Sequence, residues 1–236
     1  MIVRNVVYVS LVLLLLLFRF NSVAQQYNAD SLQQITINGS EKDKLSALQL
    51  LANIARNNNP QQALTYLSQA IEKARTIGDQ NALAACLQLS GSIENRNGNL
   101  QHAKELFLES LNQYVAINNR KGQADITVAL AGIYFMQGNL PLAADSYLRS
   151  LRYYEETNNK AGMVTTLSAL GNIYARQNNF SKSIEYNLRA ISMYEESSDK
   201  LRALVGYDNL EIFMFVRITP QKQKSILPNL LLCIPK

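Results

Sequence analysis

Apolar side chains recur at a helical spacing along most of the chain, and they predict helices in pairs. One face of residues 163–177 is apolar and consists of Leu167, Leu170, Ile173 and Tyr174, at the spacing of a helix with 3.6 residues per turn. Residues 180–194 place Ile184, Leu188 and Ile191 on a face of their own. The alternation of apolar and polar residues that is typical of strands is missing from the sequence. We therefore predict an all-α fold.

The helix pairs repeat at a fixed period along the chain. A small residue recurs at Ala63, Ala103, Ala143 and Ser183, and an apolar one at Ile71, Leu111, Leu151 and Ile191. A single pair cannot bury its apolar stripes, so neighbouring pairs must stack. The sequence therefore predicts four repeats, at residues 40–79, 80–119, 120–159 and 160–199.

Turn-forming residues separate the predicted helices. Gly98 and Gly138 stand between the two helices of a repeat, and Asn58 and Asn178 fill the same place in the outer repeats. Glycine and asparagine tolerate the left-handed conformation that ends many helices. We expect a helix end at each of these positions.

The N-terminus has the pattern of a secretory signal peptide. Arg4 precedes a short apolar run, and Ser22-Val23-Ala24 supplies small residues at the first and third places of a cleavage site. Because Arg19 interrupts the run, it is shorter than the roughly 20 residues of a membrane span. We expect cleavage of residues 1–24, a lead-in segment at residues 25–39, and a mature chain without a membrane span. Export to a bacterial periplasm is the simplest expectation.

The C-terminal end departs from the repeat. Residues 200–217 resemble the first helix of a fifth repeat, whereas residues 218–236 form an irregular tail in which Pro228 would interrupt a helix. Two interpretations stay open. The chain is either a stand-alone repeat protein with an unusual end or a truncated relic of a longer signalling protein.

Composition and charge narrow the possible functions. One His and two Cys, Cys86 and Cys233, do not supply a His/Cys metal site or a disulfide framework. The net charge of +5 comes from the two ends, so the nearly neutral repeats do not suggest a nucleic-acid partner. No motif of a phosphate loop, nucleophile elbow or zinc protease occurs. We expect no enzyme activity and no cofactor.

The repeat residues resemble those of the tetratricopeptide repeat family. They include Leu170-Gly171-x-x-Tyr174 before Ala190, and Ala131-x-x-Tyr134 before Ala143, Tyr147 and Ser150. The resemblance implies a right-handed superhelical solenoid of antiparallel helix pairs. Five residues depart from the family pattern, namely Leu51, Ile54, Glu94, Ser110 and Asn187. The 40-residue period and its Asn-Asn linkers resemble the exported sensor portions of bacterial signalling proteins of this family.

The resemblance also implies a partner surface on the concave side, along the first helix of each repeat. Its positions would be Asp125, Val128, Phe135 and Met136 in the third repeat, and Thr165, Ser168, Asn172 and Arg176 in the fourth. Phe135 and Met136 are candidates for a hydrophobic anchor. The alternative is that Phe135 packs on the next repeat as a core residue.

Two further series of side chains recur with the repeat. Arg56, Arg96 and Arg176 stand near the end of a first helix, where they could bind an acidic peptide or only offset the helix dipole. Tyr114, Tyr154 and Tyr194 stand where each second helix should meet the following repeat.

Together these features suggest an exported, non-catalytic scaffold that binds a protein or peptide. The alternative is the truncated periplasmic sensor portion of a signal-transduction protein.

Overall fold

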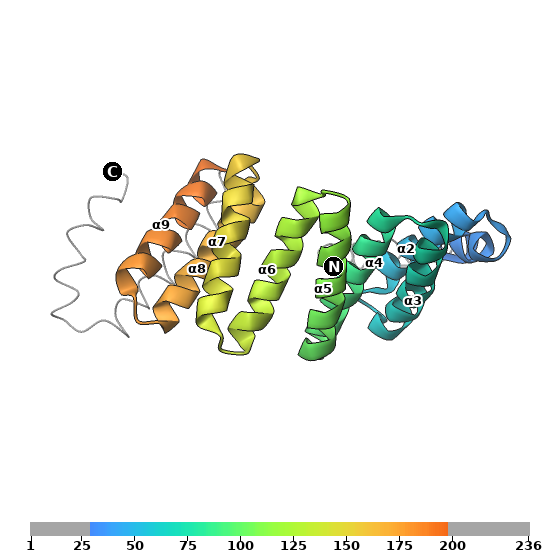
Figure 1. Ribbon diagram of the computed structural model, residues 1–236, viewed down its shortest axis with the longest axis horizontal. Coiled ribbons are helices and arrows are strands. Elements are labelled where there is room, and N and C mark those ends of the chain that lie inside the picture. Colours follow the sequence, from blue (N-terminus) through green and yellow to red (C-terminus); the bar gives the residue numbers. More distant parts are fainter. Residues whose placement is uncertain (1–28, 198–236) are drawn as a thin grey trace, which may run out of the picture. The chain divides into compact units, whose positions relative to one another are not determined.

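The computed structural model describes residues 29–197, and this part of the chain consists of helices and short turns without a strand. The predicted all-α fold of antiparallel helix pairs is confirmed (Figure 1). The predicted signal peptide, the partial fifth repeat at residues 200–217 and the irregular tail lie outside the described residues.

Each repeat contributes a first and a second helix. The helices are α2 (Glu41–Ala55), α3 (Pro60–Ile77), α4 (Gln80–Arg96), α5 (Leu100–Ala116), α6 (Arg120–Met136), α7 (Leu140–Glu156), α8 (Lys160–Arg176) and α9 (Phe180–Glu196). The chain divides after Ile117 into two compact units, which we call the N-terminal and the C-terminal unit. Repeats one and two lie in the N-terminal unit, and repeats three and four in the C-terminal unit.

The turns follow a period of half a repeat. Helices α4 to α9 are equal in length, at 17 residues each, and short turns of equal length separate them, so the helices start at regular intervals. A left-handed residue marks each turn after α3, namely Gly78, Gly98, Asn118, Gly138, Asn158 and Asn178. Asn58 was expected among them but does not adopt this conformation, because α2 ends earlier, at the right-handed residue Arg56.

Side chains at the helix starts satisfy free backbone donors. The residue before the helix accepts a hydrogen bond from the third helical N–H in every helix from α2 to α9 but one, through Ser40, Asn59, Asp79, Asn119, Asn139, Asn159 and Asn179. The exception among α2 to α9 is Asn99 before α5, which makes no such bond. Its amide Nδ2 instead donates to Glu94 Oε2 at 2.6 Å.

Small residues allow the two helices of a repeat to approach closely. A Cβ atom added at Gly91 of α4 would lie 2.8 Å from the Phe107 ring of α5. Ser110 replaces the usual alanine of the family, and its buried hydroxyl donates to the Ala84 carbonyl at 2.8 Å. The equivalent Ser150 hydroxyl donates to the Ala124 carbonyl. Each of these two serines therefore adds a hydrogen bond between the two helices of its repeat.

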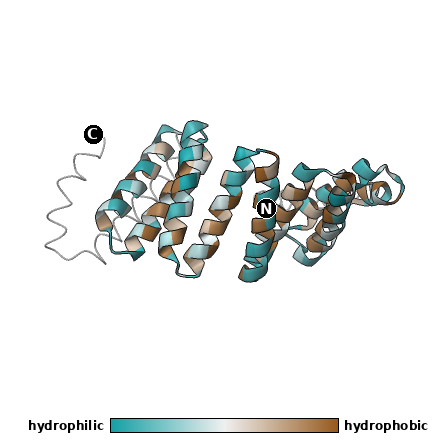
Figure 2. Ribbon diagram, viewed as in Figure 1, coloured by the Kyte–Doolittle hydropathy of each residue, from teal (hydrophilic) through white to brown (hydrophobic). Residues whose placement is uncertain are grey.

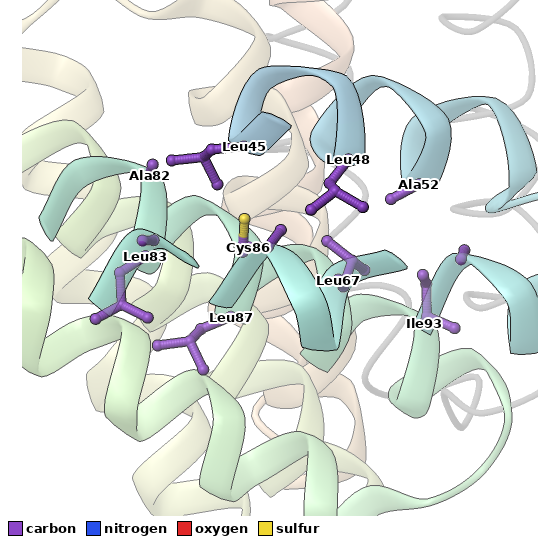
Figure 3. Packing of buried hydrophobic residues seen from close by; sticks show 12 residues of the cluster. Leu45, Leu48, Ala52, Leu67, Ala82, Leu83, Cys86, Leu87 and Ile93 are labelled. Atoms are coloured by element: carbon purple, nitrogen blue, oxygen red, sulfur yellow. The ribbon is translucent and has the colours of Figure 1, made fainter. Parts of the chain in front are cut away.

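Each unit has its own apolar core between its helices, and the outer helix faces are more polar (Figure 2). In the N-terminal unit, Leu45 and Leu48 of α2 lie close to Cys86 of α4 and to Leu67 of α3 (Figure 3). Cys86 is buried, as expected of a small core residue.

Part of the predicted lead-in segment is helical. Residues 29–38 form a helix whose Leu32 is buried in a small cluster with Ala47 and Leu51 of α2. Gln33 also donates to the Tyr66 hydroxyl of α3. This helix therefore covers the open side of the first repeat.

Candidate partner-binding face

The first helices of consecutive repeats leave a groove between them. Helix α3 packs on both α2 and α4, and α7 packs on both α6 and α8, so a second helix provides the main contact between repeats in each unit. The two first helices of a unit lie further apart in consequence. Each unit has such a groove on its first-helix face.

The groove of the N-terminal unit has a volume of about 430 Å³. It is lined by Ser46, Gln49, Leu50 and Asn53 of α2, Leu67 of α3, and Ala85, Cys86 and Leu89 of α4. We call it the N-terminal groove. Leu67 and Cys86 are buried at its floor, whereas Leu50 is 52% exposed. Burial raises the pKa of the Cys86 thiol, and a hydrogen bond from Gln49 opposes this rise in part.

The groove of the C-terminal unit is smaller, with a volume of about 260 Å³, and more polar. We call it the C-terminal groove, and its lining includes Asp125, Val128 and Thr165. The Tyr154 hydroxyl donates to Asp125 Oδ1 at 2.8 Å, and Lys121 Nζ lies 2.7 Å from Asp125 Oδ2. Both carboxylate oxygens of Asp125 are therefore held in place.

Phe135 and Arg176 meet in the C-terminal unit. The guanidinium group of Arg176, at the end of α8, lies over the Phe135 ring at 4.3 Å from its centre. Phe135 is half-buried against the core of this unit, while its neighbour Met136 is 51% exposed. A partner that contacts the Phe135 ring must therefore displace or share Arg176, which makes Met136 the more accessible of the two proposed anchors.

The other arginines of the series make a different contact. Arg96, at the end of α4, donates from Nη2 to the Arg56 carbonyl at 3.0 Å and from Nη1 to Asn57 Oδ1 at 3.4 Å. Arg96 thus offsets the negative end of α2 in the preceding repeat, not only the end of its own helix. Arg176 also reaches the preceding repeat, through the Phe135 ring. Arg56 and Arg96 lie in the N-terminal unit, whereas Arg176 lies in the C-terminal unit.

The remaining proposed site residues lie along α8. Thr165 and Asn172 are exposed, and Ser168 is half-buried. Of the positions proposed from the sequence, the C-terminal groove brings together Asp125, Val128 and Thr165. The N-terminal groove was not proposed, because its lining combines residues that do not recur with the repeat, such as Gln49 and Cys86.

The tyrosine series also differs among repeats. Tyr114 and Tyr154 are buried, whereas Tyr194 is half-buried. The Tyr154 ring meets the following repeat as expected, because a Cβ atom added at Gly162 of α8 would lie 2.6 Å from it. In repeat four, Tyr186 stacks on Tyr174 at 5.4 Å between ring centres.

Glu94 forms a polar cluster that we did not predict from the sequence. It occupies a position where the family has an aromatic residue, and it is buried. Besides the bond from Asn99, its Oε1 lies 3.4 Å from Nδ1 of the exposed His102. A sequence signal existed, since a carboxylate on a core stripe must find polar partners.

Within residues 29–197 no group of three His, Cys, Asp or Glu side chains could hold a metal ion. The helices in this range are also too short or too polar to cross a membrane.

Ion pairs link the second helices of neighbouring repeats. Arg75 of α3 pairs with Glu109 of α5 at 2.5 Å, and Arg189 of α9 pairs with Glu155 of α7 at 2.8 Å. These exposed pairs contribute little stability. The pairs join charged side chains of second helices, whereas the two grooves lie on the first-helix face.

Residues 122–196 match the family model described as tetratricopeptide repeat. No curated protein sequence matches the chain.

Several solved structures share its fold. One is a Signal Transduction ATPase with Numerous Domains protein with a tetratricopeptide repeat sensor, from Pyrococcus horikoshii, at 17% identity and a TM-score of 0.71. That match covers 85% of this chain but 31% of the archaeal protein, so this chain spans about a third of its length.

A second is the Rap conjugation gene regulator of the plasmid pLS20 in complex with the Phr* peptide, at 14% identity and a TM-score of 0.65, covering 91% of this chain and 59% of that one. A third is BtubC from P. vanneervenii, at 14% identity and a TM-score of 0.64, covering 82% and 89%. At these identities the likeness concerns the fold alone.

Proposed function

Since this chain is built from tetratricopeptide-like repeats, we propose that it is a non-catalytic scaffold that binds a peptide or protein along its first helices. The observation that carries this proposal is the groove between consecutive first helices, which occurs in both units. A groove open along its length accommodates an extended chain better than a small compact ligand. The complex of the Rap regulator with a peptide adds support from a protein of the same fold.

We also propose that the scaffold is exported and acts in a periplasm. This part rests on the signal-peptide pattern of residues 1–24. The second candidate function is the sensor portion of a signal-transduction protein, and the repeat sensor of the archaeal protein favours it. In both cases the first-helix face would bind the partner. The two functions differ only in whether binding of the partner is transmitted to a downstream regulator.

A displayed library of random decapeptides, selected on the purified full chain, tests the binding function. Thr165→Trp fills the C-terminal groove, and Leu50→Glu places a charge at the rim of the N-terminal groove. We expect each enriched peptide to lose affinity at least tenfold with one of these two variants. Arg152→Trp and Leu108→Glu change exposed residues of second helices and serve as matched controls.

Two results would contradict the proposal. One is that no peptide is enriched above the level of an unrelated helical protein. The other is that enriched peptides bind all groove variants with unchanged affinity but lose binding with the second-helix variants, which would place the binding surface on the opposite face.

A further inference from the structure

The N-terminal groove has a large, exposed apolar side chain at its rim. Leu50 is 52% exposed, whereas its neighbour Leu51 is buried and lies as far from the cap of α2 as Leu130 and Leu170 lie from the caps of α6 and α8. It stands at the rim, opposite the half-buried Leu89, above the buried Leu67. An apolar rim over an apolar floor is characteristic of a surface that binds another apolar group.

None of the eight residues that line the N-terminal groove carries a charge. A charged side chain that entered it would lose water without gaining a partner of opposite charge, which is costly. The C-terminal groove differs, because Asp125 contributes a carboxylate. The N-terminal groove therefore suits an uncharged aliphatic side chain.

The rim on α2 also presents two side-chain amides. Gln49 and Asn53 are one helical turn apart, so their side chains are separated by about 6 Å. Residues that point the same way along an extended peptide repeat at about 6.8 Å. Gln49 Nε2 donates to Cys86 Sγ at 3.4 Å, and a thiol sulfur is a weak acceptor. A peptide carbonyl is a better acceptor, so an extended backbone can replace the sulfur as partner.

From these three observations we propose that the N-terminal groove binds an extended peptide segment and takes up one uncharged aliphatic side chain, such as leucine, between Leu50 and Leu89. The backbone of the segment runs along α2 and accepts a hydrogen bond from Gln49. The inference rests on the proposed scaffold function and adds to it the location of a subsite and the chemistry of the side chain that the subsite selects.

The test uses decapeptides enriched from the random library and then synthesised with a fluorescent label. We expect a group of them to share an aliphatic residue whose replacement by Ser, Asp or Lys lowers affinity at least tenfold. Leu50→Glu and Ala85→Phe should lower their affinity by a similar factor, the first by its charge and the second by filling the groove. Leu108→Glu introduces the same charge at another exposed leucine and should leave binding unchanged.

Folding of the variants is checked by far-ultraviolet circular dichroism, since Leu50 and Ala85 are exposed and their replacement should preserve the helices. If every enriched peptide keeps its affinity with both groove variants and loses it only with Thr165→Trp, this inference is overturned and the scaffold function is left intact. A library without any enriched peptide would overturn both.

The competing hypothesis is that the tail of this chain, residues 218–236, occupies the N-terminal groove. A chain that ends at residue 217 should bind the labelled peptides as the full chain does. If removal of residues 218–236 raises their affinity tenfold or more, the groove holds the tail and the proposal of an external partner is wrong.

Discussion

At the scale of single residues, Tyr154 connects several neighbours. Its ring lies against Gly162 of the following repeat, and its hydroxyl donates to Asp125 of its own repeat. It also forms an edge-to-face pair with Tyr153 at 5.7 Å between ring centres. One side chain therefore stabilises the contact between repeats and positions a carboxylate in the C-terminal groove.

Two substitutions separate these roles of Tyr154. Tyr154→Ala removes the ring from the contact between repeats and should lower the free energy of unfolding by about 3 kcal/mol. Tyr154→Phe removes only the bond to Asp125 and should cost about 1 kcal/mol. Urea denaturation measures both. Equal midpoints for Tyr154→Ala and the parent chain would contradict the packing described for this ring.

The same tyrosine should make stability depend on alkaline pH. Burial, and next the hydrogen bond to Asp125, raise the pKa of Tyr154 above its usual value of 10. The folded state therefore holds this proton more tightly than the unfolded state does. Its contribution is fully present below about pH 10 and is lost as the pH rises further. Unfolding free energies at pH 8 to 11 should fall less steeply for Tyr154→Phe than for the parent. Parallel curves for the two proteins would contradict this.

At the scale of helices, the crossing within a repeat depends on the room available at a small residue. Gly91 leaves no room, because an added Cβ would lie 2.8 Å from the Phe107 ring. Gly132 of α6 does leave room, since the nearest atom is the Tyr147 hydroxyl oxygen at 3.6 Å. Both glycines lie inside helices, where alanine has the higher helical propensity.

The two glycines therefore predict opposite effects of one substitution. Gly91→Ala should lower the free energy of unfolding by about 1 to 3 kcal/mol, because the Phe107 ring is fully packed and must move. Gly132→Ala should raise it by about 0.5 to 1 kcal/mol through helical propensity. Thermal denaturation of the two variants measures both changes in stability. A gain of stability for Gly91→Ala would mean that α4 and α5 can separate without loss.

The sequence predicted the helices well because their ends depend on local signals. A left-handed glycine or asparagine followed by an Asn or Asp cap recurs at each half repeat and is visible in the sequence alone. The failure at Asn58 has a local cause too, since α2 stops sooner than the repeat suggests.

Side-chain contacts between different helices were harder to predict from the sequence. Arg176 and Phe135 were each proposed as binding residues, but their mutual stacking depends on how two repeats pack. The capture of Asn99 by Glu94 likewise cancels a cap that the sequence would suggest. The N-terminal groove depends on the one leucine that its repeat leaves exposed.

At the scale of the whole molecule, the helix at residues 29–38 belongs with the repeats. Its Leu32 packs against Ala47 and Leu51 of α2. Cleavage after Ala24 would leave this helix intact. A signal peptide and a protective first helix can therefore follow one another before the first repeat begins.

The export proposal predicts a mature chain that starts at Gln25. Mass spectrometry of the protein recovered from its own host should find this N-terminus, because Ser22-Val23-Ala24 supplies the small residues of the cleavage site. An intact Met1 would contradict the proposal. Ala24→Arg should prevent processing and serves as the control for the site.

The regular turns make the C-terminal unit extensible. Asn158-Asn159 precedes α8 just as Asn118-Asn119 precedes α6, and Gly162 has its counterpart in Gly122. A second copy of residues 120–159, inserted after Asn159, would offer the Tyr154 ring a glycine at the place it already requires. Each added copy contributes one more interface between repeats. The lengthened chain should therefore melt at a higher temperature than the parent, and the protein can be regarded as a segment of a polymer whose length is open to choice.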